Sequence, residues 1–84
     1  MRKSIHRPEY KVLVALLRER REAAGVTQVE LSRSLGRSQS FVSDLERGQR
    51  RLDVIELRDI CAHLRVDLMK FIAELQGRLR RRAS

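Results

Sequence analysis

The 84-residue chain has the length of one small domain, a formal net charge of +8 and a pI near 11.2. Of its 19 basic residues 16 are Arg, whose guanidinium suits paired hydrogen bonds to phosphates and guanine edges. This balance favours a nucleic acid as partner over an anionic membrane surface. A single Cys excludes an internal disulfide, and no apolar run reaches the length of a membrane span, so we expect a cytoplasmic protein.

Residues 1–8 are polar and basic and are predicted to form a flexible arm. Over residues 9–24, apolar side chains recur at helical spacing, which predicts a first helix with one face toward the core. Gly25 stands where this helix would end. Arg20 and Arg21 lie at the edge of the apolar stripe, where one of them can pair with a buried carboxylate.

A short helical pattern opens the stretch 27–48, TQVELSRSLGRSQSFVSDLERG. Thr27 and Glu30 have the spacing of a capping box at its start. Gly36 follows the apolar residues of this helix. The residue after a helix end often adopts a left-handed conformation, which glycine favours. These features predict a helix of about two turns followed by a tight turn.

A second helix is predicted over residues 38–47, with Ser38 as its N-cap. Val42 and Leu45 form its inward stripe, and Gly48 ends it. Two short helices joined by a tight turn form a helix-turn-helix unit. The outward side chains of the second helix are short and polar, as suits the base edges of a major groove; they are Gln39, Ser40, Ser43 and Asp44.

The next helix is predicted over residues 52–64, with Asp53 as N-cap and Glu56 at the capping-box position. Cys61 falls on the apolar stripe of this helix. It is therefore interpreted as a small buried hydrophobe rather than a reactive or ligating group.

A last helix is predicted over residues 67–76, with Asp67 as its cap. It carries four large apolar residues on one side, which makes it a candidate dimerisation element; they are Leu68, Phe71, Ile72 and Leu75. Core packing alone is the alternative, because small domains use nearly every apolar residue they have. The Arg-rich stretch 77–84 is predicted to be a disordered tail, either a phosphate-binding arm or a solubilising end.

The sequence TQVELSRSLG followed by SQSFVSDLERG resembles the helix-turn-helix of phage repressor, Cro and xenobiotic-response-element (Xre) type regulators. The resemblance extends from about Leu13 to Leu75. It implies an all-α, five-helix phage-repressor-like domain over residues 9–76. The residues at family spacing are Gln28, Glu30, Leu31, Gly36, Gln39, Ser43, Leu45, Glu46 and Gly48.

The resemblance implies a transcriptional regulator that binds double-stranded DNA, as a homodimer on a near-palindromic operator. In the resembled family the positions of Gln39, Ser40 and Asp44 read bases, while those of Gln28 and Arg47 bind backbone phosphates. Ser43 faces outward with the base-reading set. Neighbouring polar and basic residues extend the set expected to contact the DNA backbone; they are Arg37, Ser38, Arg50 and Arg51. The alternative is that the outward side chains of the second helix form a solvated face that contacts no partner.

Two residues depart from the family pattern. Asp44 places a negative charge where the family often has a neutral or basic residue; it could accept from cytosine N4 or pair with Arg47. Phe41 is interpreted as partly buried, with one edge near the groove. The resemblance also implies that Arg21 pairs with Glu46, and the alternative is two solvated surface charges.

The sequence holds no Cys and His spacing of a metal site, no paired carboxylates and no Ser–His–Asp set. We therefore expect no enzymatic activity, cofactor or metal, no small-molecule ligand and no membrane partner. The competing hypothesis is a protein-interaction module, antitoxin-like or adaptor, with weak or no specific DNA binding. Its contact surface would be Phe41 and the C-terminal apolar stripe.

Overall fold

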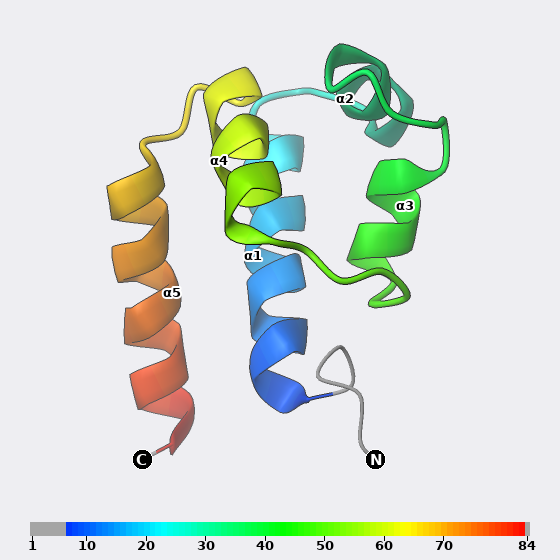
Figure 1. Ribbon diagram of the computed structural model, residues 1–84. Helices are drawn as coiled ribbons and strands as arrows, with labels where there is room; N and C mark the ends of the chain where they lie inside the picture. Colours follow the sequence, from blue (N-terminus) through cyan, green and yellow to red (C-terminus); the bar gives the residue numbers. More distant parts are fainter. Residues whose placement is uncertain (1–6, 84) are drawn as a thin grey trace.

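The computed structural model describes residues 7–83, which form five α-helices and no strand. The central helix α1 lies between α5 on one side and α3 on the other, with α4 in front (Figure 1). The short helices α2 and α3 pack together and make the helix-turn-helix unit. The bounds are α1 Pro8–Ala23, α2 Gln28–Ser34, α3 Phe41–Glu46, α4 Val54–His63 and α5 Leu68–Ala83. None of these helices is both long and apolar enough to cross a bilayer.

Side-chain caps fix the starts of α2 and α4, as predicted. The Thr27 hydroxyl oxygen accepts from the Glu30 N–H at 3.1 Å, and Glu30 Oε1 accepts from the Thr27 N–H at 2.8 Å. Asp53 and Glu56 make the same reciprocal pair at 2.7 and 3.1 Å. Each box satisfies two backbone donors that a helix start leaves unpaired. Asp67 caps α5 by accepting from the Lys70 N–H at 3.0 Å.

The first four helices are each followed closely by a residue with positive φ. Three are glycines, with φ of 72° at Gly25, 68° at Gly36 and 72° at Gly48. Gly36 lets the chain reverse between α2 and α3, where its N–H and that of Arg37 bond back to carbonyls of α2. The fourth is Arg65, with φ of 58°.

The hydrophobic core joins all five helices. The predicted inward residues of the helix-turn-helix, Leu31, Val42 and Leu45, are each 2% exposed. Cys61 is buried with them, and burial raises the pKa of its thiol. Ser32 is fully buried and its hydroxyl oxygen accepts from the Val42 N–H at 3.1 Å, which ties α2 to the start of α3.

The predicted disordered tail is wrong, because α5 continues through Gly77 to Ala83. Arg78 holds this extension on the domain: its guanidinium donates to both carboxylate oxygens of Glu19 at 2.7 Å and to Glu74 at 3.1 Å. Tertiary contact with α1 thus overrides the helix-ending tendency of glycine. At the other terminus, Pro8 is the first residue of α1 rather than the end of an arm. Residues 1–6 of the predicted arm, and residue 84, lie outside the described residues.

The second helix of the unit is shorter than the predicted range 38–47, and Ser38 is not its N-cap. The Ser38 carbonyl instead accepts from the Phe41 N–H at 3.0 Å, which forms a turn before α3. Ser40 occupies the N-cap position and makes no side-chain cap hydrogen bond. Its backbone is already in the right-handed region, whereas capping hydroxyls need an extended residue. Gln39 and Ser40 therefore lie on the turn that leads into the helix.

Candidate DNA interface

A buried ion pair anchors the helix-turn-helix to α1. Arg21 Nε donates to Glu46 Oε2 at 2.7 Å and Nη2 donates to Oε1 at 3.0 Å, while Nη1 donates to the Val26 carbonyl at 2.7 Å. The two side chains are only 9% and 6% exposed. The pair implied by the resemblance is therefore present, and it fixes α3 and the start of the unit against α1.

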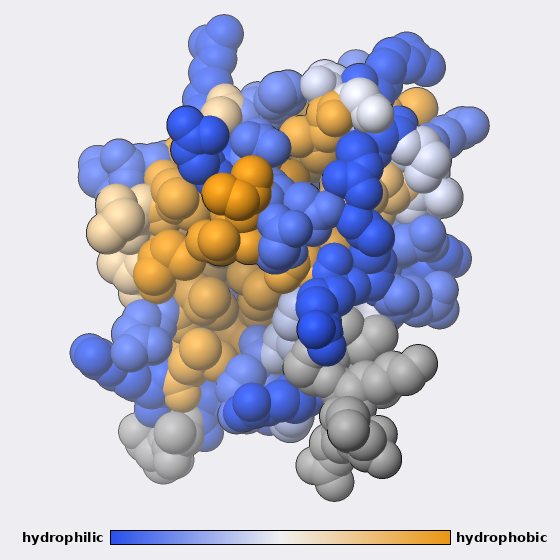
Figure 2. Space-filling view, in the orientation of Figure 1, coloured by the Kyte–Doolittle hydropathy of each residue, from blue (hydrophilic) through white to orange (hydrophobic). Residues whose placement is uncertain are grey.

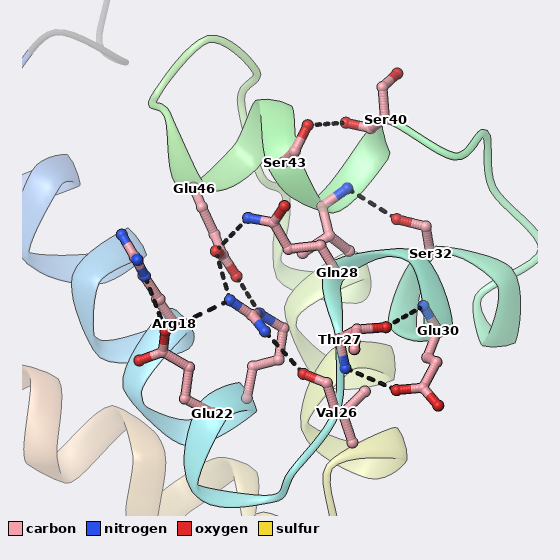
Figure 3. A network of polar contacts seen from close by, with 12 residues as sticks. Arg18, Glu22, Val26, Thr27, Gln28, Glu30, Ser32, Ser40, Ser43 and Glu46 are labelled. Atoms are coloured by element: carbon pink, nitrogen blue, oxygen red, sulfur yellow. Dashed lines mark hydrogen bonds and ion pairs between the residues drawn. The ribbon is translucent and has the colours of Figure 1, made fainter.

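Gln28 belongs to the same network. Its amide Nε2 donates to Glu46 Oε1 at 2.8 Å, and Figure 3 shows the two side chains directed toward each other. The predicted phosphate contact of this side chain would therefore compete with a charge-assisted hydrogen bond inside the protein.

The outer side of α3 forms an open notch with the start of α2. Gln39 and Ser40 are exposed and Ser43 is half-buried, with its hydroxyl donating to the Ser40 carbonyl at 3.2 Å (Figure 3). The structure brings these three predicted base-reading side chains together, and Gln28 and Val29 complete the lining. Amide and hydroxyl groups gathered in this way can donate to and accept from base edges.

Asp44 pairs with Arg47. Arg47 Nη2 lies 2.6 Å from Asp44 Oδ1, at side chains that are 60% and 34% exposed. Of the two alternatives left open by the sequence, the pair is present in the structure of the protein alone. The negative charge at the outer side of α3 is therefore matched by a positive one beside it.

The interpretation of Phe41 as a groove-edge residue is wrong, because its ring is 4% exposed and belongs to the core. The guanidinium carbons of Arg37 and Arg50 lie 4.2 and 4.7 Å from the ring centroid, as in cation–π contacts. Both guanidinium groups also donate to Glu56 Oε2, at 3.0 Å from Arg37 and 2.6 Å from Arg50. The Arg50 carbonyl accepts from the Tyr10 hydroxyl at 2.7 Å.

Glu56 therefore organises a second polar cluster, a role that its place in the capping box did not reveal. Burial alone would raise the pKa of its carboxyl, but the Asp53 N–H and the two guanidinium groups hold that pKa below the ordinary value of 4.5. Arg37 and Arg50 were predicted to bind the DNA backbone, yet their guanidinium groups are held within the domain. Ser38, Arg47 and Arg51 are exposed members of that predicted set, and Arg37 is exposed although its guanidinium contacts Glu56 and the Phe41 ring.

The predicted dimerisation stripe lies largely in the core. Phe71 is 1% exposed, and Leu68 and Leu75 pack against the core, so core packing accounts for these three residues. Ile72 remains 38% exposed. Figure 2 shows apolar side chains gathered over α4 and α5. The exposed large apolar residues of these two helices form what we call the α4–α5 patch: Val54, Ile55, Met69 and Ile72.

The family model described as a helix-turn-helix domain matches residues 12–69. Among solved structures, an XRE-family like protein from Pseudomonas syringae pv. tomato str. DC3000 is 47% identical, with a TM-score of 0.80 over 88% of this chain and 90% of that one. The chain belongs to the XRE family of helix-turn-helix proteins.

Two structures of the clp gene regulator ClgR from Corynebacterium glutamicum are also similar to this XRE-family chain. One is 28% identical with a TM-score of 0.78, covering 92% of this chain and 82% of the other. The second is 29% identical with a TM-score of 0.74, covering 86% and 94%. Comparison with curated protein sequences gives no match. The all-α, five-helix fold is confirmed, and as an XRE-family helix-turn-helix protein the chain is a DNA-binding transcriptional regulator.

Proposed function

We propose that this regulator reads a specific sequence in double-stranded DNA by placing the outer side of α3 in the major groove. The observation that carries the proposal is the notch where the polar side chains of Gln39, Ser40 and Ser43 converge. The buried Arg21–Glu46 pair anchors α3 to α1 and so supports a fixed position of this surface, which base readout requires. In this docking α2 lies across the backbone, as in other helix-turn-helix proteins.

The net charge of +8 supports a substantial phosphate contribution to binding. Arg47 and Arg51 are the exposed cations nearest the end of α3 in the chain, so we assign backbone contacts to them first. If about six phosphates are neutralised, the logarithm of affinity falls with the logarithm of salt at a slope of about −5.

We further propose that the protein binds as a homodimer through the α4–α5 patch. Met69 is 73% exposed and Ile55 61%, and apolar surface of this kind is stabilised when a second copy covers it. A two-fold dimer places its recognition helices about 34 Å apart, which matches successive major grooves on one side of DNA. The operator is then near-palindromic.

Selection from a random-sequence duplex pool tests this function, with Gln39→Ala beside the wild type. We expect a near-palindromic motif for the wild type and altered base preference at defined positions for the variant. Gln76→Ala, at an exposed residue of α5, is the matched control and keeps the wild-type motif. Recovery of no motif with folded protein would reject sequence-specific reading.

The α4–α5 patch favours a second candidate function, a protein-interaction module with weak or no specific DNA binding. Asp44 gives this alternative little support, because Arg47 matches its charge. The two functions differ in their response to salt. A DNA reader retains salt-sensitive affinity for random duplex, whereas a flat response favours the interaction module.

A further inference from the structure

Val29 is an apolar side chain in a polar setting. It is the second residue of α2 and is partly exposed, outside the hydrophobic core and the ring of side chains packed against it. Among the described residues that line the notch, Val29 alone is apolar; the other four are Gln28, Gln39, Ser40 and Ser43.

Helix propensity does not favour a valine at this position, because valine is a weaker helix former than alanine. Its partly exposed side chain lies outside the core cluster and lines the notch, so part of its apolar surface is open there. On the base edges of the major groove, however, one apolar group is exposed, the 5-methyl of thymine. An apolar side chain among hydrogen-bonding ones suits a surface that must read this methyl beside polar edges.

We propose that Val29 determines specificity by packing against the 5-methyl of a thymine in each half-site, next to the base read by Gln39. The inference rests on the proposed function, because it requires the notch to face the major groove. It adds one base-reading residue from α2 to the proposed base-reading residues of α3 and of the turn before it.

Uracil substitution tests the contact, because uracil lacks only the thymine methyl. Each thymine of the selected operator is replaced in turn, and the Kd is measured for the wild type and for Val29→Ala. At one position per half-site we expect the wild type to lose about fourfold in affinity, the worth of burying one methyl group. Val29→Ala binds thymine and uracil at that position alike.

Val12→Ala is the matched control, since Val12 is a partly exposed valine of α1 that lies outside the core cluster, the notch and the α4–α5 patch. It retains the wild-type loss on uracil substitution. Val29→Thr gives a second reading, because it keeps the shape of valine and one of its methyl groups; we expect a loss between those of wild type and Val29→Ala. Thermal unfolding of each variant checks that the fold is intact.

The inference is overturned if uracil costs the wild type and Val29→Ala the same at every position. A selected motif without a Val29-dependent thymine overturns this inference and leaves the proposed function standing. Failure to select any motif rejects both.

Discussion

Arg21 and Glu46 stand 25 positions apart in the chain and meet through two parallel hydrogen bonds, of 2.7 and 3.0 Å, at almost fully buried side chains. Hydrogen bonding to Glu46 also raises the pKa of Arg21, so the guanidinium remains charged. Gln28 donates to the same carboxylate, which links α1, α2 and α3 at one point. The orientation of α3 thus depends on a charge pair as well as on apolar packing.

We predict that Glu46→Ala destabilises the fold by roughly 3–5 kcal/mol, because it leaves the Arg21 charge buried without its partner. Urea unfolding measures the effect. Glu22→Ala is the control, since Glu22 is 54% exposed in its contacts to Arg18 at 3.2 Å and to Arg21 at 3.9 Å, and its loss costs under about 1 kcal/mol. Arg21→Met combined with Glu46→Leu should recover most of the stability. Equal losses in Glu46→Ala and Glu22→Ala would contradict the buried role.

Mutation of the exposed arginines after α3 should affect DNA binding, whereas mutation of the arginine that makes contacts within the domain should affect stability. Arg47→Ala and Arg51→Ala are each expected to lower the salt slope of DNA binding by about one, with little change in unfolding. Arg50→Ala should instead lower the unfolding midpoint, because it removes contacts to Glu56 and the Phe41 ring. Titrations across a salt series, with melting curves, separate the two classes.

Arg58→Ala provides the control for charge alone, because Arg58 is 69% exposed on α4 and its nearest carboxylate contact is 3.8 Å. It should change neither the salt slope nor the midpoint. The same salt slope for Arg47→Ala and Arg58→Ala would show that Arg47 does not meet a phosphate.

Acid should weaken the fold through Glu56. Because the pKa of Glu56 is lower in the folded state than its ordinary 4.5, its contribution is complete above that pH and is lost as the pH falls through the folded value. We expect Glu56→Gln to make stability fall less steeply below pH 4.5. Urea unfolding at several pH values measures this, with Asp59→Asn on the exposed side of α4 as the matched loss of charge. The same steepness in wild type and Glu56→Gln would contradict the prediction.

Arg78→Ala should loosen the last turns of α5 without unfolding the domain. Arg78 joins this segment to Glu19 of α1, and its pair is too exposed to contribute much global stability. Amide hydrogen exchange over residues 79–83 is expected to become faster, while the melting midpoint changes little. Arg81→Ala, whose contact to Glu74 is 3.7 Å, serves as the control. Unchanged exchange in Arg78→Ala would mean that α5 is held by other contacts.

The sequence predicted the features that depend on neighbours along the chain. Thr27 with Glu30, and Asp53 with Glu56, form their capping boxes because three-residue spacing decides that geometry. The helical stripes around Val42 and Cys61 were correct for the same reason.

Features that depend on distant contacts were missed. Phe41 packs in the core and is also covered by Arg37 and Arg50, from two separate segments, and no local pattern predicts these contacts. Gly77 was taken as the end of a helix, but Arg78 reaches Glu19, 59 residues away, and keeps the helix on α1. The residue types of the candidate site were predictable from the sequence. Which arginines make contacts within the domain, and which remain exposed, depends on tertiary structure and was not predictable.

The turn at Arg65 bears on how readily α5 detaches from the domain. Where three earlier turns use glycine, this one holds a side-chain-bearing residue at φ of 58°, a conformation that costs roughly 1–2 kcal/mol for an L-amino acid. The docking of α5, through Phe71 and Arg78, keeps the connection in that conformation. When α5 leaves the domain, Arg65 can relax to an ordinary conformation and the strain is released. This release lowers the free energy needed to detach α5, so heating should loosen α5 more readily than if position 65 were a glycine.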